Sequence, residues 1–510
     1  MRSADERPFA EAGDGARARP MLAAERGGFI DRHQLWGSAQ HAAAAQMRRV
    51  IDELGLEMIR FSFADQHGLL RGKTITRDGV PSALRSGLTA PSSLLLKDTS
   101  GRSVFPVFGA GSGGSAPAVG GFANAGDVVL VPDPTAFRVL PWAERTGWVL
   151  CDVRRPDGSL TSLCTRSLLR EQLRALAGLG YDLTVGVELE FHVFRANRST
   201  LAADQVGGPG APGRPSEVGP TSPGAQLLHE EDLDRVDPVV QLLYDGLTGL
   251  DLPIRSLELE FGPSQLEITL KASDAAQAAD DVILTRSAIR QICRRHGYHA
   301  TFMSRPAGTE SASTGWHLHQ SLRDRRTGAA VFDPAPGETG LSGTAGRYLA
   351  GLLTHARAAA VFTTPTVNGY KRYLPHSLAP DRVVWGIDNK GAMVRLAGGG
   401  LDSGSRLENR TGEPAANPYL YIAAQLASGM DGLTRGLDPG PPVEDPYSAE
   451  AGRLPRSLGE ALDALDTDPL FATAFGDEVV SWYSRLKRAE FARYLAHVSD
   501  WEQREYFDLF

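Results

Sequence analysis

Residues 182–193 read DLTVGVELEFHV, and apolar and non-apolar positions alternate throughout this stretch. Such alternation is typical of a β-strand with one face in the core, because successive side chains point to opposite faces. The second face carries Glu188 and Glu190, so two carboxylates point the same way, about 7 Å apart. A single strand of this kind is most often an antiparallel strand with one solvent-exposed face.

Four further segments repeat the design, with apolar residues on one face and polar or ionisable groups on the other. The groups on the polar faces are Glu258 and Glu260 in 256–261, Gln265 and Glu267 in 265–270, His317, His319 and Ser321 in 316–322, and Arg406, Glu408 and Arg410 in 406–410. This density of Glu, with His and Arg beside it, favours one shared pocket over five solvated faces. Carboxylates that share a pocket repel each other unless cations neutralise them.

A carboxylate-rich pocket with a single imidazole suits Mg²⁺ or Mn²⁺, whereas zinc sites favour His and Cys. Mg²⁺ commonly accompanies a nucleoside triphosphate, whose phosphates arginine side chains bind in a bidentate manner. The sequence contains no P-loop and no dinucleotide-type glycine motif, so a nucleotide would occupy another kind of site. The arginines available for phosphate are Arg372, Arg395, Arg406 and Arg410.

Composition fits a globular protein of more than one domain, with 510 residues of which 42% are hydrophobic. The net charge of -8 argues against nucleic acid or an anionic membrane as a partner. The three cysteines form no CxxC pair, so neither a disulfide framework nor a structural zinc site is expected. We find no signal peptide and no apolar stretch that could span a bilayer, and we expect a cytoplasmic protein.

The pattern along the chain predicts an α+β protein. Residues 1–28 resemble a disordered tail, 29–140 a first domain of one helix (31–54) and strands, and 141–510 a second, catalytic domain. A Gly/Pro-rich run at 205–224 is too poor in apolar residues for a core and predicts a flexible surface insertion. Further helices are predicted at 238–250, 274–296, 345–360, 418–437 and 457–465.

From about residue 52 to 506 the chain resembles the glutamine synthetase superfamily through a series of short motifs in the family's order. They include DPT at 133–135, GVELEF at 186–191, EFGPSQLEI at 260–268, GWHLH at 315–319, NGYKR at 368–372 and RLENR at 406–410. The resemblance implies an N-terminal β-grasp domain and a catalytic domain with an antiparallel β funnel flanked by helices. It also implies a homo-oligomer, usually a double-ring dodecamer, whose active sites are shared between subunits.

The resemblance also implies roles for individual residues. It implies that Glu190, Glu260 and Glu267 bind one metal, that Glu188, His317 and Glu408 bind another, and that each active site holds two or three Mg²⁺ or Mn²⁺ ions. ATP and its phosphates would contact His319, Ser321, Lys390, Arg395 and Arg406. The acid substrate would contact Arg372 and Arg410, which with Arg395 form the catalytic arginines.

The implied reaction is a ligation in two steps. A carboxylate of the acid, glutamate in the family, attacks the γ-phosphate of ATP and becomes an acyl phosphate. Phosphate is a good leaving group, so an amine can displace it and form an amide.

Several positions depart from the ammonia-using members of the family. Leu378 stands where those enzymes carry a glutamate that closes the site and helps to deprotonate ammonium, and the acid of their Asp-Gly-Ser-Ser segment has no counterpart in 90–101. Ala312 and Ser313 replace the Asn-Gly pair that holds glutamate, and Lys390 replaces an arginine. We therefore expect a ligase that forms a γ-glutamyl amide from an organic amine. The alternatives are an ammonia-using synthetase, a catalytically silent scaffold, and a guanidino kinase, which the N-terminal match disfavours.

Overall fold

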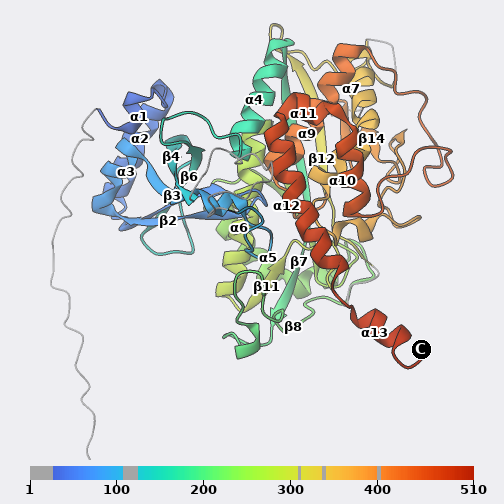
Figure 1. The fold of residues 1–510 in the computed structure, drawn as a ribbon, viewed down its shortest axis with the longest axis horizontal. Helices are drawn as coiled ribbons and strands as arrows, with labels where there is room; N and C mark the ends of the chain where they lie inside the picture. The colour runs from blue at the N-terminus through green and yellow to red at the C-terminus, as the bar shows by residue number, and fades with distance from the viewer. Residues whose placement is uncertain (1–26, 107–124, 308–311, 336–339, 399–403) are drawn as a thin grey trace, which may run out of the picture.

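The computed structural model describes residues 27–106, 125–307, 312–335, 340–398 and 404–510. The tail predicted at residues 1–28 lies almost entirely outside these ranges. The described chain forms a mixed α and β fold with two sheets, and the first sheet with its helices stands beside a larger second part (Figure 1). Within the described ranges, no helix is both long and apolar enough to cross a bilayer.

The first sheet has the strand order β2-β1-β6-β4-β3, with β5 paired to β6. Its strands are β1 (Met58–Ala64), β2 (Leu70–Thr76), β3 (Leu88–Pro91), β4 (Asp127–Pro132), β5 (Arg138–Val139) and β6 (Thr146–Arg154). Strand β1 turns Ile59, Phe61 and Phe63 into the core, which its alternating sequence predicts. The helices beside the sheet are α1 (Phe29–Arg32), α2 (Ser38–Glu53) and α3 (Val80–Ser86).

Two sequence predictions need correction in this part. The helix expected over 31–54 is two helices, separated by a break in which Trp36 Nε1 donates to the carbonyl of Pro132 at 2.9 Å. The domain boundary predicted between residues 140 and 141 falls inside the first sheet, because β6 pairs in parallel with β1 and antiparallel with β4. The first sheet therefore continues to Arg154.

The second sheet has the order β13-β14-β15-β12-β7-β10-β9, with β8 and β11 also paired to β7. All pairs are antiparallel except β13 with β14. The strands are β7 (Tyr181–Ala196), β8 (Val218–Gly219), β9 (Ile254–Leu259), β10 (Gln265–Asp274), β11 (Tyr298–Thr301), β12 (Trp316–Asp324), β13 (Trp385–Ile387), β14 (Val394–Ala397) and β15 (Arg406–Asn409). The apolar face of β7 is fully buried, which stabilises the fold by about 1.5–3 kcal/mol for each large side chain.

The remaining helices belong to the second part, where all but the last, α13, lie around the second sheet (Figure 1). They are α4 (Thr165–Gly178), α5 (Glu230–Thr248), α6 (Ala275–Arg295), α7 (Gly343–Thr354), α8 (Ala356–Thr363), α9 (Pro418–Arg435), α10 (Leu458–Thr467), α11 (Pro469–Phe475), α12 (Asp477–Leu495) and α13 (Asp500–Tyr506). Short 3₁₀ helices are η1 (Arg77–Gly79), η2 (Ser92–Leu96), η5 (Pro134–Ala136), η6 (Ala203–Gln205) and η7 (Gly369–Arg372). The helix predicted at 238–250 begins earlier, since Pro238 lies inside α5, and the one predicted at 345–360 is divided at His355.

The last residues of the Gly/Pro-rich insertion are fixed to the second sheet. Strand β8 pairs with the end of β7, Thr221 Oγ1 donates to the carbonyl of Val193 at 2.6 Å, and the backbone N–H of Ser264 donates to Ser222 Oγ at 2.9 Å. These contacts attach residues 218–222 to the second sheet, and the flexibility of the insertion stays a prediction.

A buried cluster of charges joins the first sheet to the helices of the second part. We call Asp133, Asp152, Arg166, Arg170 and Asp280 the arginine cluster. Arg166 binds all three aspartates, at 2.9 Å to Asp133 and Asp152, and Arg170 binds Asp133 at 2.9 Å and Asp152 at 2.7 Å. Against the cost of burial, Arg166 and Arg170 lower the pKa of Asp133 to about 2. Every aspartate of this cluster thus has an arginine partner.

Candidate active site

The register of the second sheet brings together ionisable groups that are far apart in the sequence. Glu188 on β7 lies opposite His317 on β12, and Glu190 lies opposite Glu267 on β10. Glu408 on β15 lies opposite His319. Side chains directly opposite each other in antiparallel strands are neighbours, so three strand pairs place these groups on one face. We call Glu188, Glu190, Glu260, Glu267, His317 and Glu408 the carboxylate cluster.

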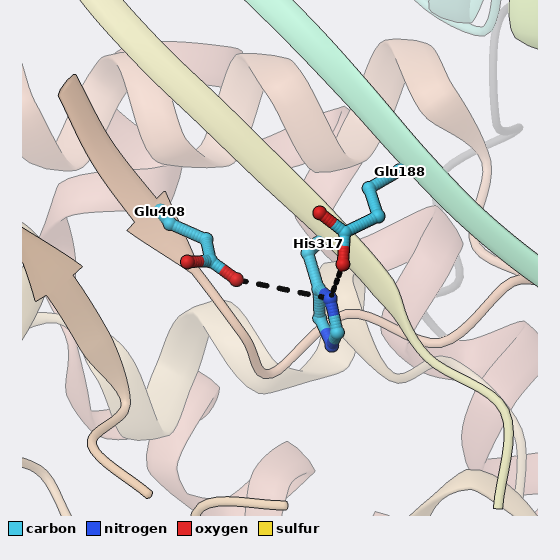
Figure 2. A group of neighbouring side chains, drawn as sticks. All are labelled: Glu188, His317 and Glu408. Carbon is cyan, nitrogen blue, oxygen red and sulfur yellow. Dashed lines mark hydrogen bonds and ion pairs between the residues drawn. The ribbon is translucent and has the colours of Figure 1, made fainter. Parts of the chain in front are cut away.

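One half of the carboxylate cluster is centred on His317 Nδ1. This atom lies 2.7 Å from Glu188 Oε1 and 3.7 Å from Glu408 Oε1. Figure 2 shows Glu188 and Glu408 directed at the imidazole from different strands. One ligand atom from each of the three residues lies within 4.8 Å of the others, which is close enough for a shared cation. The structure therefore brings together the set predicted for one metal.

The other half contains Glu190 and Glu267, which together with His317 form a second group with ligand atoms within 4.8 Å of one another. His317 Nε2 lies 3.8 Å from Glu190 Oε1. Glu260, predicted with Glu190 and Glu267, is not in this group, and the backbone N–H of Phe261 donates to its carboxylate at 3.4 Å. Its charge still raises the pKa of both other carboxyls, so it lies nearby.

Burial and mutual repulsion hold protons on this half of the cluster. Burial, and then Glu260, raise the pKa of Glu190 to about 8, and burial with the charges of Glu188 and Glu190 raises that of Glu267 to about 10. Burial also raises the pKa of Glu260. Because these carboxyls can ionise near neutral pH only beside a positive charge, a divalent cation fits the site.

The pKa values of Glu188 and Glu408 are lowered instead of raised, because these carboxyls have positively charged or hydrogen-bond-donating partners. Although burial opposes it, the two histidines lower the pKa of Glu188, and Arg410 with His317 lowers that of Glu408. Burial and Arg410 lower the pKa of His317 itself, so its neutral ring stabilises Glu188 through a hydrogen bond. Arg395 Nη1 donates to Glu408 at 2.9 Å, and Arg410 binds the other oxygen.

A cavity of about 420 Å³ opens beside Glu188. Its lining includes the four nucleotide-binding candidates His319, Ser321, Arg395 and Arg406. Lys390, the fifth candidate, is exposed and does not line this cavity. Its positive charge nevertheless works to lower the pKa of Glu260, against the effect of burial. The cavity is large enough for a small-molecule substrate.

Arg255 also lines this cavity, although the sequence pattern did not predict that its side chain would point there. By alternation, Arg255 shares the apolar face of Leu257 and Leu259. The pairing of β9 with β10 shifts between Thr269 and Leu270, and Arg255 is the residue left out of the register. A bulge of this kind re-aims a side chain, and it cannot be recognised from alternation alone.

The two arginines predicted for the acid substrate both lie beside the carboxylate cluster. Arg372 is buried in η7, where its Nη1 donates to the carbonyls of Thr411 and Gly412, and its charge favours ionisation of Glu190. A Cβ at Gly315 would lie 2.6 Å from Arg372 Nη2, so a larger residue there would displace this guanidinium from the carbonyls that it binds. Arg410 contacts Glu408 and, at 3.5 Å, the carbonyl of Leu378.

Leu378, the candidate for the amine site, lies in the loop between η7 and β13. Its φ is 59° and its surface is 53% exposed. Leu374, in the same loop, is 46% exposed. The loop therefore presents apolar side chains beside Arg410, where an ammonium ion would need an anionic group.

Comparison with known proteins gives consistent matches. Residues 162–506 match the family described as glutamine synthetase, catalytic domain. A gamma-glutamylanilide synthase of Acinetobacter sp is 43% identical over 94% of this chain and 99% of its own length. A glutamine synthetase of Halobacterium salinarum is 30% identical over 93% of this chain and 99% of its own length. A solved structure described as a GmaS/ADP complex superposes with a TM-score of 0.74 and 28% identity, over 90% of this chain and 99% of that one.

Proposed function

The chain belongs to the glutamine synthetase family and is an ATP-dependent, amide-forming ligase, and we propose that it joins glutamate to an organic amine with Mg²⁺ or Mn²⁺ as cofactor. The family uses ATP and a divalent metal. The observation that carries the proposal is the carboxylate cluster, a set of five glutamates and one histidine, four of them buried, beside a cavity whose lining includes arginines. Clustered buried carboxylates with raised pKa values are costly and are retained mainly where they bind a ligand.

The carboxylate cluster fits two cations. Glu188, His317 and Glu408 would hold one, and Glu190, Glu260 and Glu267 the other, because oxygen-rich donor sets suit Mg²⁺ and Mn²⁺. When bound, such ions neutralise charge on the transferred phosphoryl group. His319, Ser321, Arg395 and Arg406 bind the nucleotide from the adjoining cavity, and Lys390, which does not line that cavity, contributes its positive charge beside Glu260.

The reaction requires the acid to be oriented and water to be excluded. Arg372 and Arg410 hold the carboxylates of glutamate, so that the γ-carboxylate oxygen attacks the γ-phosphorus of ATP and the bond to ADP breaks. Arg395 faces the same cavity and stabilises the negative charge of the phosphoryl group as it is transferred. The amine nitrogen then attacks the carbonyl carbon of γ-glutamyl phosphate, phosphate leaves, and the proton lost by the nitrogen passes to the departing phosphate. The acyl phosphate has to be shielded from water between these steps.

An organic amine is favoured over ammonia by Leu378 and by the relatives. The apolar loop at Leu378 suits a bulkier nucleophile that enters uncharged. The chain is 43% identical to a gamma-glutamylanilide synthase and 30% identical to a glutamine synthetase, so an aromatic amine of the aniline type is the first candidate.

A test of the nucleophile measures phosphate release from ATP with glutamate, Mg²⁺ and one amine at a time, and identifies the product by mass. We expect a γ-glutamyl amide from aniline or an alkylamine and little product from ammonium. A Leu378→Glu variant should gain activity with ammonium and lose activity with the amine. Leu374→Glu, in the same loop, should change neither activity. Product from ammonium alone would contradict the proposal.

We also propose a cytoplasmic double-ring dodecamer with an N-terminal β-grasp domain in each subunit. Three buried free cysteines suit a reducing compartment. Helix α13 extends away from the body of the chain (Figure 1), and its surroundings expose Trp501, Phe507 and Phe510, which supports contacts with another subunit. Sedimentation should give a dodecamer, and a chain ending at residue 496 should give smaller species. A monomer at working concentration would contradict this assembly.

A further inference from the structure

A second cavity lies between the first sheet and the second part of the molecule. Its walls are the turn between β1 and β2, one face of α6, and β11 with the residues that follow it. Its volume is about 580 Å³, within the range of small-molecule sites. It shares no lining residue with the cavity beside Glu188. We call it the interdomain cavity.

The charged side chains that line the interdomain cavity are all arginines, namely Arg71, Arg286, Arg290 and Arg294. Three of them follow each other at four-residue spacing along α6, so they occupy one face of the helix. Like charges at this spacing destabilise a helix. No carboxylate of the described residues lines the cavity to offset them.

Two of the four arginines have protein partners. Arg71 Nε binds Asp65 at 2.9 Å, and Arg286 donates to the carbonyls of Gly68, Pro414 and Ala416. Arg290 and Arg294 form no hydrogen bond or ion pair with any residue that the structure describes. Their guanidinium groups are therefore free to bind a ligand.

The electrostatic environment of these arginines is unfavourable without an anion. Burial, and then the charge of Arg294, lower the pKa of Arg290. Burial, and then Arg290, lower the pKa of Arg286 to about 10. Burial, and then the charges of Arg290 and Arg294, which are both partly open to solvent, lower the pKa of His299 in the cavity wall. A bound anion would offset the repulsion between like charges that contributes to each of these shifts.

We propose that the interdomain cavity binds a small multivalent anion, with Arg290 and Arg294 on its charged group and Leu70, Ile283 and Phe302 against its carbon skeleton. Planar guanidinium groups one helical turn apart suit the oxygens of a phosphate or of a di- or tricarboxylate. The ligand would connect the β1–β2 turn to α6, because both line the cavity. The proposal does not depend on the ligase reaction, whose groups line the other cavity.

The test uses calorimetric titration of the full chain with pyrophosphate and, separately, with citrate, in EDTA so that neither anion acts through a metal. We expect at least one of them to bind, and Arg290→Ala/Arg294→Ala to weaken that binding at least tenfold. Arg290→Lys/Arg294→Lys keeps the charge without the planar fork and should weaken it less. A control of equal charge, Arg174→Ala/Arg325→Ala, removes two exposed arginines elsewhere and should leave binding unchanged.

Each outcome is decisive. Binding of pyrophosphate alone assigns a phosphate ligand, binding of citrate alone assigns a polycarboxylate, and binding of both assigns multivalent charge as the recognised feature. Binding that is lost in Arg406→Ala but kept in Arg290→Ala/Arg294→Ala would place the anion in the nucleotide cavity and overturn the proposal. Absence of binding by the unaltered protein would also overturn it. Unchanged basal phosphate release and circular dichroism confirm that the double variants fold.

Discussion

The arginine cluster and the carboxylate cluster are both largely buried and both rich in acids, but only in the first does every acid have an arginine partner. In the arginine cluster, Arg166 and Arg170 supply a partner for each of three aspartates, and the pKa of Asp133 falls to about 2. In the carboxylate cluster, Glu190 and Glu267 face each other across two strands, and their pKa values rise to about 8 and about 10. The first cluster is neutralised by the chain's own arginines, whereas the second needs a cation from outside the chain.

Removing the central cation of the arginine cluster should give the largest loss of stability. Arg166→Met leaves three buried carboxylates without their main partner, which should lower the free energy of unfolding by about 3–5 kcal/mol. Urea denaturation followed by circular dichroism measures the change. Arg174→Met, on the same helix but 69% exposed, is the control and should have almost no effect. Equal urea midpoints for Arg166→Met and Arg174→Met would show that the aspartates of the arginine cluster do not depend on Arg166.

Removing an acid from the carboxylate cluster should raise the free energy of unfolding of the metal-free protein, the opposite of the effect of Arg166→Met. Glu267→Gln replaces a carboxyl that holds its proton at pH 8, so the metal-free protein should become more stable by on the order of 2 kcal/mol. Ligase activity should fall by about 100-fold or more because a cation ligand is lost. The control is Glu258→Gln, whose side chain lies opposite Glu267 on the neighbouring strand, and its effects should be smaller. If Glu267→Gln instead destabilised the metal-free protein, the carboxyl of Glu267 would already have a stabilising partner within the chain, and the comparison would fail.

The pH dependence of stability should separate the two clusters. Glu190 keeps its proton in the folded metal-free protein up to about pH 8, whereas an unfolded glutamate loses it near 4.5, so stability falls as the pH rises between these values. Asp133 acts at the acid end, where stability falls as the pH drops from about 4 toward 2. Thermal unfolding in EDTA from pH 3 to 9 should show both declines, and Mg²⁺ should reduce only the alkaline one. A flat profile between pH 5 and 8 would contradict this account.

The smallest effect is expected at Arg170, the outer cation of the arginine cluster. Its side chain is 35% exposed, and Arg166 still binds both of its partners after Arg170→Ala. We expect a loss of about 1 kcal/mol, measured in the same urea experiment. A loss as large as that of Arg166→Met would mean that the cluster acts as one inseparable unit.

The sequence predicted most of the second sheet because alternation marks both faces of a strand. The polar faces of β7, β10, β12 and β15 were read directly, and they hold five of the six residues assigned to metals. What alternation could not show was register and irregularity. Alternation put Glu260 on the same face as Glu258, but Glu260 lies just beyond the end of β9. Arg255 enters the cavity beside Glu188 at a shifted pairing, which periodicity does not predict.

The first sheet was predicted less well because its boundary depends on long-range pairing. Strand β6 lies beyond the expected end of the first domain, yet it pairs with β1 about 90 residues earlier in the chain. The arginine cluster was missed for the same reason, since its five residues come from separated segments and no local pattern links them. The Arg290 and Arg294 pair was hidden within an ordinary amphipathic helix.

The most direct test of the central claim is calorimetric titration of the metal-free protein with Mn²⁺ at pH 7, in two buffers of different ionisation enthalpy. Because Glu190 and Glu267 are protonated there without a cation, we predict saturable binding that releases about one to two protons for each active site. His317→Ala should abolish most of that binding. Mn²⁺ binding without proton release, or no binding at all, would contradict the assignment of this cluster as a cation site.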